Sequence, residues 1–176
     1  MLFRDSVNVS FVNGKESKSL EYSEWIAKVH DCLMRRIVLY RTPYSSLHPV
    51  SAPVFFNEFS QFLKNVVMCP EVLVICGDFN LHLDDLLDND SKKFMDLQET
   101  FSLLQHVSGP THQSGHTLDL VITRSSDDVV FASPKAIFPI SDHFIIQCPI
   151  VFQRPALSCK EVTFRKLNYL NLITMV

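Results

Sequence analysis

Several stretches of the chain carry the apolar and β-branched residues that are typical of β-strands. In chain order they cover residues 7–12, 19–29, 35–41, 71–76, 116–124, 128–138 and 143–152. The run EVLVIC at 71–76 is almost wholly apolar, which indicates a strand that is buried on both faces. Asn13-Gly14, between the first two stretches, predicts the tight turn of a β-hairpin.

Two other stretches have the spacing of amphipathic helices, with apolar residues three and four positions apart. The first covers 51–67 and begins near Ser51. The second covers 88–105, and Ser91 is its expected N-cap. Helices and strands alternate in the middle of the chain, while strands follow one another at its ends. The sequence therefore predicts mixed sheets in a layered α/β or α+β sandwich.

The composition is that of an ordinary globular protein, with 47% hydrophobic and 20% charged residues in a chain of 176. A net charge of −3 does not indicate a protein that binds nucleic acid by charge alone, although a local basic surface is compatible with it. The five cysteines form no CxxC pair, so we expect a reducing compartment and no disulfides. Neither a signal peptide nor an apolar run of about 20 residues is visible, so we expect a soluble intracellular protein that does not bind membranes.

Polar residues directly follow the apolar run at 71–76. Gly77 allows a sharp turn, and Asp78 and Asn80 come next. A carboxylate can accept a proton from water or bind a hard cation, and a carboxamide both donates and accepts hydrogen bonds. Ligand sites commonly form at the carboxyl ends of strands. The alternative is an Asx turn that only ends the strand, because Asp and Asn are common turn residues.

Two later strands carry polar residues of the same kind. Asp119 lies within an apolar strand, where a carboxylate is costly unless it has a partner. Ser141, Asp142 and His143 stand at the entry to the last strand. Histidine titrates near neutral pH and is the usual general base. We therefore expect Asp119 and His143 to form a pair.

The strand at 35–41 ends in Tyr40 and Arg41 beside a proline turn, and both side chains are able to contact a phosphate. Together, the four strand ends carry the residues needed for metal-assisted hydrolysis of a phosphodiester. For other histidines, such as His82 and His112, we expect surface positions rather than places in the cleft.

Three motifs, ICGDFNLHLDD, THQSGHTLDLVIT and PISDHF, follow one another in an order and spacing that resembles the endonuclease/exonuclease/phosphatase superfamily. With the upstream IVLYRTPYSS, the chain most resembles the apurinic-type endonuclease domain of non-LTR (LINE-type) retrotransposons. The resemblance implies an α+β fold, a four-layered α/β/β/α sandwich that is incomplete at the N-terminus. We expect this domain over residues 1–152, and over 153–176 a connector tail like those that lead to reverse transcriptase in such elements.

The resemblance also implies a chemistry, the Mg²⁺-dependent cleavage of DNA, with Mn²⁺ as a substitute metal. It implies that Asp78 orients or activates the attacking water, and that Asn80 helps to hold this water and the phosphate. His143 is implied to contact the scissile phosphate or to transfer a proton, while Asp119 fixes its orientation. Tyr40 is implied to hydrogen-bond the phosphate.

Three further positions receive supporting roles from the same resemblance. Asp142 is implied to lie in the metal region, and Ser141 to support its loop. Arg41 is expected to support a loop or the phosphate. A protein of this kind that acts on genomic DNA is expected in the nucleus, and the sequence indicates no stable protein partner.

The N-terminal part of the chain departs from the family pattern. The family has an Asn strand and a metal-binding Glu well upstream of its Tyr motif, whereas only 39 residues precede Tyr40 here. None of Glu16, Glu21 and Glu24 has the flanking pattern of that Glu. We therefore expect a truncated domain that binds Mg²⁺ weakly and is catalytically impaired when alone. The alternatives are a noncatalytic relic that binds nucleic acid or a partner, and a phosphatase that acts on a small phosphoester.

Overall fold

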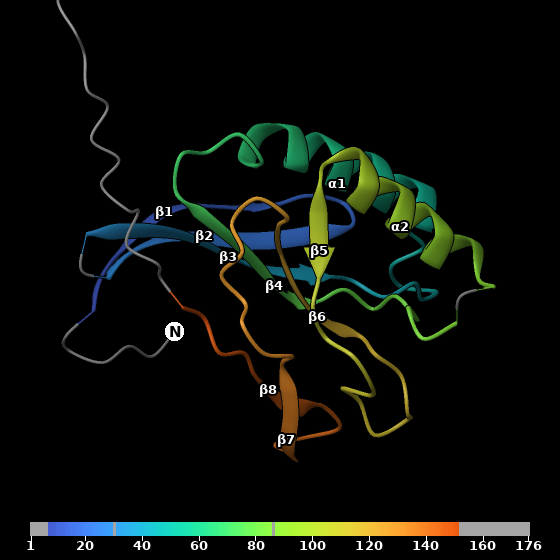
Figure 1. Ribbon diagram of the computed structural model, residues 1–176. Coiled ribbons are helices and arrows are strands. Elements are labelled where there is room, and N and C mark those ends of the chain that lie inside the picture. Colours follow the sequence, from blue (N-terminus) through green and yellow to red (C-terminus); the bar gives the residue numbers. More distant parts are fainter. Residues whose placement is uncertain (1–6, 30, 86, 152–176) are drawn as a thin grey trace, which may run out of the picture.

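The strand-like stretches form one large sheet and one small one, and two helices cover a single face of the large sheet (Figure 1). The structure, a computed structural model, describes residues 7–29, 31–85 and 87–151. Its elements are, in order, β1 Asn8–Glu16, β2 Leu20–Val29, β3 Cys32–Arg41, α1 Ala52–Val66, β4 Val72–Asp78, α2 Asn89–Thr100, β5 Leu103–Gln105, β6 Asp119–Arg124, β7 Lys135–Pro139 and β8 Phe144–Gln147.

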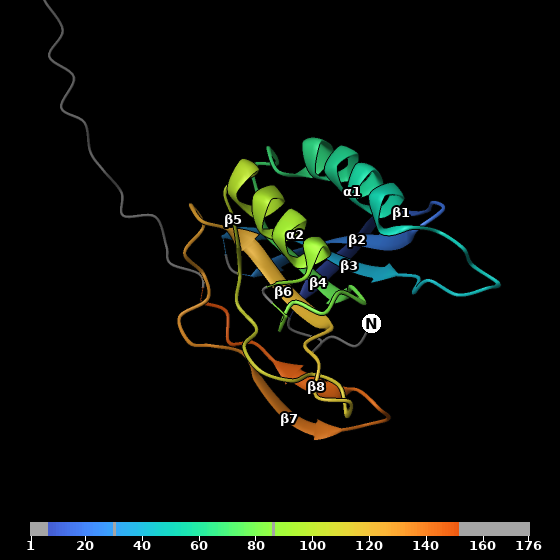
Figure 2. The same cartoon turned by 90° about the vertical axis from the view of Figure 1, so that its right-hand side faces the viewer.

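The large sheet has the strand order β1-β2-β3-β4-β6-β5, and β7 pairs with β8 in the small one. Among the strands of the described residues, only β3 and β4 pair in parallel, and α1 makes the connection between them. Both views place α1 and α2 on one side of the large sheet and the β7–β8 pair on the other (Figures 1 and 2). The predicted α+β class is confirmed. Of the four implied layers, the described residues contain the helices, the large sheet and the small sheet.

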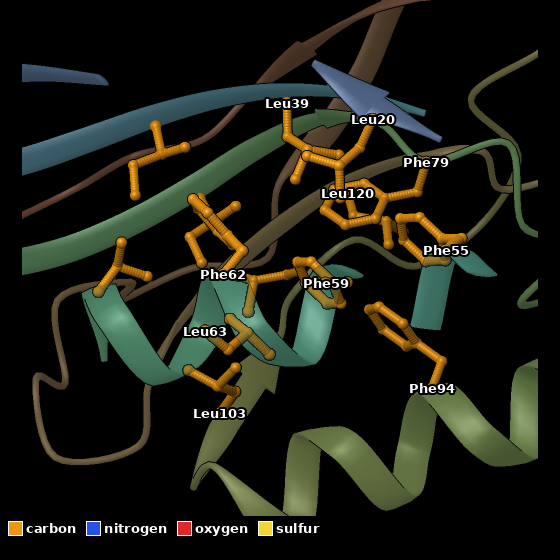
Figure 3. Close-up of a cluster of buried hydrophobic side chains, with 14 of the residues drawn as sticks. Leu20, Leu39, Phe55, Phe59, Phe62, Leu63, Phe79, Phe94, Leu103 and Leu120 are labelled. Atoms are coloured by element: carbon orange, nitrogen blue, oxygen red, sulfur yellow. The ribbon is translucent and has the colours of Figure 1, made fainter. Parts of the chain in front are cut away.

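The main core lies between the helices and the large sheet. The helical spacing of α1 turns Phe55, Phe59 and Phe62 toward the sheet, and all three are buried. The ring of Phe59 stacks on Phe94 of α2 at 6.2 Å between centroids and meets Phe79 edge-on at 5.7 Å (Figure 3). This aromatic layer fixes the helices against the strands that carry the polar residues described below.

The second helix differs from its predicted bounds at both ends. Its N-cap is Asp88, whose carboxylate accepts from the N–H groups of Asp90 and Ser91, so the prediction of Ser91 as the cap is wrong. The helix ends at Thr100 rather than at residue 105. Ser102 adopts a positive φ of 52°, and β5 begins at the next residue. Because a serine rather than a glycine takes this conformation, the sequence gives no clear stop signal there.

The first hairpin forms, but its turn lies four residues later than predicted. Asn13-Gly14 lies inside β1, next to an irregularity in the register with β2. The chain turns at residues 17–19, where Glu58 of α1 accepts hydrogen bonds from Ser17 Oγ, Ser19 N–H and Ser19 Oγ. A contact across 39 and more residues therefore fixes the turn, and a local pattern does not reveal it.

The face of the large sheet opposite the helices carries a second, smaller core. Val74 and Val121 pack there with Ile146 of β8 and Ile150. The predicted strand at 128–138 is formed only over Lys135–Pro139, and that at 143–152 only over Phe144–Gln147. The tail from residue 153 lies outside the described residues. In the part of the chain that is described, no helix is long and apolar enough to span a membrane.

Candidate active site

Tyr40, Asp78 and Asp119, which we call the site row, lie side by side at one end of the large sheet. Tyr40 of β3 pairs in register with Asp78 of β4, and Asp78 pairs with Asp119 of β6. Residues that pair directly point to the same face of a sheet. The site row shares its face with Val74 and Val121, so it points away from the helices. Sequence motifs from three separate strands are thus brought together on one surface.

Asp78 forms the Asx turn that was the alternative to a functional role. Its carboxylate accepts from the backbone N–H of Asn80 at 3.0 Å and from the side-chain amide of Asn80 at 3.1 Å. Asn80 has a positive φ of 48°, which asparagine tolerates better than most residues. The two interpretations do not exclude each other, because the turn leaves the carboxylate in the site row. Burial raises the pKa of Asp78 above its ordinary value, although the Asn80 N–H opposes this.

Arg41 lies below the site row, on the helix side of the sheet. Only 7% of it is exposed, and its guanidinium lies over the ring of Phe55, 5.0 Å from the centroid. Its Nη1 donates to the carbonyl oxygen of Asn80 at 2.6 Å, and the Asn80 amide donates to the Arg41 carbonyl at 2.8 Å. This position corresponds to loop support, one of the two roles expected for Arg41. Burial lowers its pKa from the ordinary value.

The expected pair of Asp119 and His143 is present in the structure. His143 Nδ1 lies 2.8 Å from a carboxylate oxygen of Asp119, and Nε2 lies 3.9 Å from Asp78. Burial alone lowers the pKa of His143, but the hydrogen bond and the charge of Asp119, with those of Asp78 and Asp142, raise it above its ordinary value. The imidazole is thus oriented by one aspartate and faces another.

The loop of residues 111–114, which we call the brace loop, holds this pair in place. The sequence did not single out three of its residues, Thr111, Gln113 and Ser114, as functional. Thr111 Oγ1 accepts from the N–H groups of Leu118 and Asp119, both at 2.9 Å. The Thr111 carbonyl accepts from Phe144 N–H at 2.8 Å. The loop therefore ties Asp119 to the residue after His143.

The same loop also forms hydrogen bonds with residues 141–142, directly before His143. Gln113 donates from its backbone N–H to the Asp142 carbonyl and from its side chain to the Ser141 carbonyl, both at 2.8 Å. The Ser141 hydroxyl accepts from His143 N–H at 3.2 Å. A polar loop without periodicity gives little local signal for these contacts. In the sequence, the loop is marked by its place just before the strand with Asp119, at the start of the motif THQSGHTLDLVIT.

We expect Thr111→Val to destabilise the protein by about 2 kcal/mol or more, because it leaves two buried N–H groups without an acceptor. Thr111 is fully buried, so water does not replace the lost oxygen. Urea unfolding of the variant against the parent measures the change. Thr111→Ser is the matched control, since it keeps the oxygen and removes only a methyl group. Equal losses in the two variants would show that methyl packing, not hydrogen bonding, is what matters.

His112 was expected at the surface and instead contacts the site. Its ring meets that of His143 edge-on at 4.8 Å, and its Nε2 lies 3.3 Å from a carboxylate oxygen of Asp142. This hydrogen bond lowers the pKa of the exposed Asp142. His82, in contrast, is exposed as expected, and its ring stacks on His116.

Two kinds of metal ligand occur at the site. His112, Asp142 and His143 offer ligand atoms that all lie within 4.8 Å of one another, the one such group of three among the described residues. For a hard cation, the oxygen donors are Asp78, Asn80 and Asp142, and Mg²⁺ needs only one or two carboxylates when water completes its shell. The chemistry of this donor set, two carboxylates and one amide oxygen, fits Mg²⁺.

The glutamates of the N-terminal hairpin differ in their positions. Glu24 is buried and pairs with Arg35, so it is not free to bind a metal. Glu21 is exposed and pairs in register with Tyr40, and Glu16 pairs with Glu21. These two carboxylates therefore extend the site row toward the edge of the sheet.

Comparison with known proteins identifies the fold. No protein-family model matches the sequence, and no curated protein is significantly similar to it. Among solved structures, the endonuclease domain of TRAS1, a telomere-specific non-LTR retrotransposon, matches with a TM-score of 0.63 at 12% identity, over 87% of this chain and 73% of that one. The catalytic domain of human nocturnin matches at 0.56 and 16% identity, over 80% and 58%.

Two further matches have similar scores. An endonuclease/exonuclease/phosphatase family protein from Leptotrichia buccalis has a TM-score of 0.55 at 11% identity, over 85% of this chain and 74% of that one. TDP2 from D. rerio, in complex with a single-strand DNA product, also reaches 0.55 at 11% identity, over 80% and 67%. At these identities the likeness concerns the fold alone. The chain therefore has the fold of the endonuclease/exonuclease/phosphatase proteins.

Proposed function

We propose that the chain is a metal-dependent phosphodiester hydrolase that acts on DNA, the endonuclease-like domain of a non-LTR retrotransposon. The observation that carries the proposal is the Asp119–His143 pair, which faces Asp78 within the site row. The likeness in fold to the TRAS1 endonuclease domain and to TDP2 supports DNA as the substrate. A protein that acts on genomic DNA works in the nucleus.

Asp78 and Asn80 are assigned to the attacking water. The raised pKa of Asp78 makes its carboxylate a better proton acceptor than an exposed aspartate. The Asn80 amide nitrogen is already engaged with Asp78 and with the Arg41 carbonyl, so its oxygen is left to hold the water.

His143 and Tyr40 are assigned to the phosphate. The raised pKa of His143 favours the imidazolium, whose Nε2–H donates to a phosphate oxygen while Asp119 holds Nδ1–H. Tyr40 is 39% exposed at the end of the site row, where its hydroxyl donates to the same group. Each donor offsets part of the negative charge that accumulates in the transition state.

Mg²⁺, or Mn²⁺ in its place, is assigned to the oxygen donors Asp78, Asn80 and Asp142. When bound, such an ion neutralises charge on the phosphate. Because these donors do not include the metal-binding Glu of the family pattern, we expect weak binding and low activity for the chain alone. Glu21, the exposed neighbour of Tyr40, is the nearest glutamate to this group along the row.

We expect the purified chain to nick supercoiled plasmid slowly with Mg²⁺ and not with chelator, and His143→Ala to lower this slow rate by about 10²-fold or more. His48→Ala is the matched control, because His48 is an exposed histidine in a loop and contacts none of the site residues. Gel quantification of relaxed plasmid gives the rates, and circular dichroism checks folding. A folded chain that nicks as fast with chelator as with Mg²⁺, or a His143→Ala variant of full activity, contradicts the proposal.

A further inference from the structure

His112 adds a second imidazole beside His143 and Asp142. Its Nε2 lies 3.3 Å from Asp142, and its ring is edge-on to that of His143 at 4.8 Å. All three side chains offer ligand atoms within 4.8 Å of one another. In a tetrahedral zinc site with bonds of about 2.0–2.1 Å, neighbouring ligand atoms are a little over 3 Å apart. Small side-chain rotations therefore suffice to enclose an ion.

The opposite nitrogen of each ring is already held from outside the group. His143 Nδ1 is bonded to Asp119, which leaves Nε2 available, 3.9 Å from Asp78. The Ser114 backbone N–H donates to His112 Nδ1 at 3.0 Å, and Ser114 Oγ lies 2.6 Å from the same nitrogen, so the proton of the neutral ring is on Nε2, 3.3 Å from Asp142. Histidines that bind metals almost always have such a partner on the second nitrogen, which fixes the ring orientation. The orientation of both rings is thus fixed, but His112 must move its proton from Nε2 to Nδ1 before Nε2 can bind a metal.

The donor set selects the kind of metal. Two imidazole nitrogens and one carboxylate suit Zn²⁺ and similar ions, whereas Mg²⁺ prefers oxygen ligands alone. Three protein ligands with the fourth position open to water form a common zinc arrangement. We propose that His112, Asp142 and His143 form a zinc site, which shares Asp142 with the Mg²⁺ donors and adds two imidazole nitrogens.

Zinc binding moves protons in a defined way. Neutral His143 already carries its proton on Nδ1, toward Asp119, and any second proton on Nε2 is released to solvent. Neutral His112 shifts its single proton from Nε2 to Nδ1, which then donates to Ser114 Oγ at 2.6 Å and no longer accepts from the Ser114 N–H. The affinity therefore falls with decreasing pH, as for any site whose ligands must lose protons.

The site also bears on activity, and this second part rests on the proposed function. His143 Nε2 is the atom assigned to the phosphate, and a bound zinc ion withdraws it. Zn²⁺ is therefore expected to inhibit nicking in the presence of Mg²⁺. Binding itself needs no hydrolase activity, so failure of the zinc site and failure of the hydrolase proposal are measured separately.

Calorimetric titration of the folded chain with Zn²⁺ tests the site, with Co²⁺ as a spectroscopic probe of tetrahedral ligands. We expect one equivalent to bind and the affinity to fall at least tenfold in both His112→Gln and Asp142→Asn. His116→Gln is the matched control, because His116 pairs with Asp84 at 3.0 Å and lacks a third ligand. An unchanged affinity in His112→Gln and Asp142→Asn, or an equal loss in His116→Gln, overturns the site. Inhibition of nicking that persists in His112→Gln overturns the proposed effect on activity.

Discussion

Gly77→Ala is expected to lower the free energy of unfolding by about 3 kcal/mol or more, enough to unfold much of a marginally stable domain. Gly77 has a φ of 146°, a backbone conformation that residues other than glycine rarely adopt. It also pairs with Leu39 in the parallel ladder between β3 and β4. A Cβ atom at this position comes far inside van der Waals contact with the Leu39 carbonyl oxygen. The two strands must separate, and Asp78 is the next residue.

Gly109→Ala is the matched control for this prediction. Gly109 also has a positive φ, 87°, but a Cβ atom built there meets nothing within 4 Å. Its replacement therefore measures backbone strain alone, about 1 kcal/mol. Chemical unfolding of both variants under the same conditions gives the two losses. If they are equal, the close approach of β3 and β4 has no energetic role.

Asp119→Asn is expected to reduce the rate of DNA nicking by about 10²- to 10⁴-fold and to lower the pKa of His143. The amide keeps the size of the side chain and removes the charge that favours the imidazolium. Nuclear magnetic resonance of the imidazole carbon protons follows the pKa directly. Asp96→Asn, on the exposed face of α2, is the control for loss of one negative charge. If Asp119→Asn keeps the parent's pKa of His143 and the parent's nicking rate, as the Asp96→Asn control is expected to do, the result would falsify the role of Asp119.

The same substitution has a predictable effect on stability against pH. Because the pKa of His143 is raised in the folded state, the pair stabilises the parent protein fully below the ordinary histidine pKa of 6.5. This contribution is lost as the pH rises through the raised pKa. The difference in unfolding free energy between parent and Asp119→Asn is therefore expected to be larger at pH 6 than at pH 9. The opposite trend would mean that the imidazole is neutral in the folded state.

The sequence predicted one contact of the candidate site but not the arrangement of the strands that carry it. Asp119 and His143 were paired on the argument that a carboxylate in an apolar strand needs a partner, and they lie within hydrogen-bond distance. The order of the strands was not predictable, because the register that places Tyr40 beside Asp78 joins segments far apart in the chain. The brace loop was missed for a related reason. Thr111 acts through its buried oxygen, and burial of a polar loop residue leaves no periodic pattern.

Local signals failed where tertiary contacts or backbone conformation overrode them. Asn13-Gly14 is a strong turn signal, yet the turn forms where Glu58 binds Ser17 and Ser19. The helical pattern continues to Leu104, yet the positive φ of Ser102 ends the helix earlier. The hairpin turn depends on a contact with a residue distant in sequence. The helix end depends on a positive φ at a serine, a residue type that does not predict this conformation.

The position of the site row on consecutive strands limits how the spacing of its residues can change in evolution. Tyr40, Asp78 and Asp119 stand on consecutive strands, so the hydrogen-bond ladder sets their spacing at about 4.8 Å per strand. Slipping one strand by a single residue turns its side chain to the helix face. The distance between these groups can therefore change only in steps of a whole strand or a whole residue. Evolution can lengthen or shorten a side chain to fit another substrate, but it cannot move the strands by a fraction of a residue.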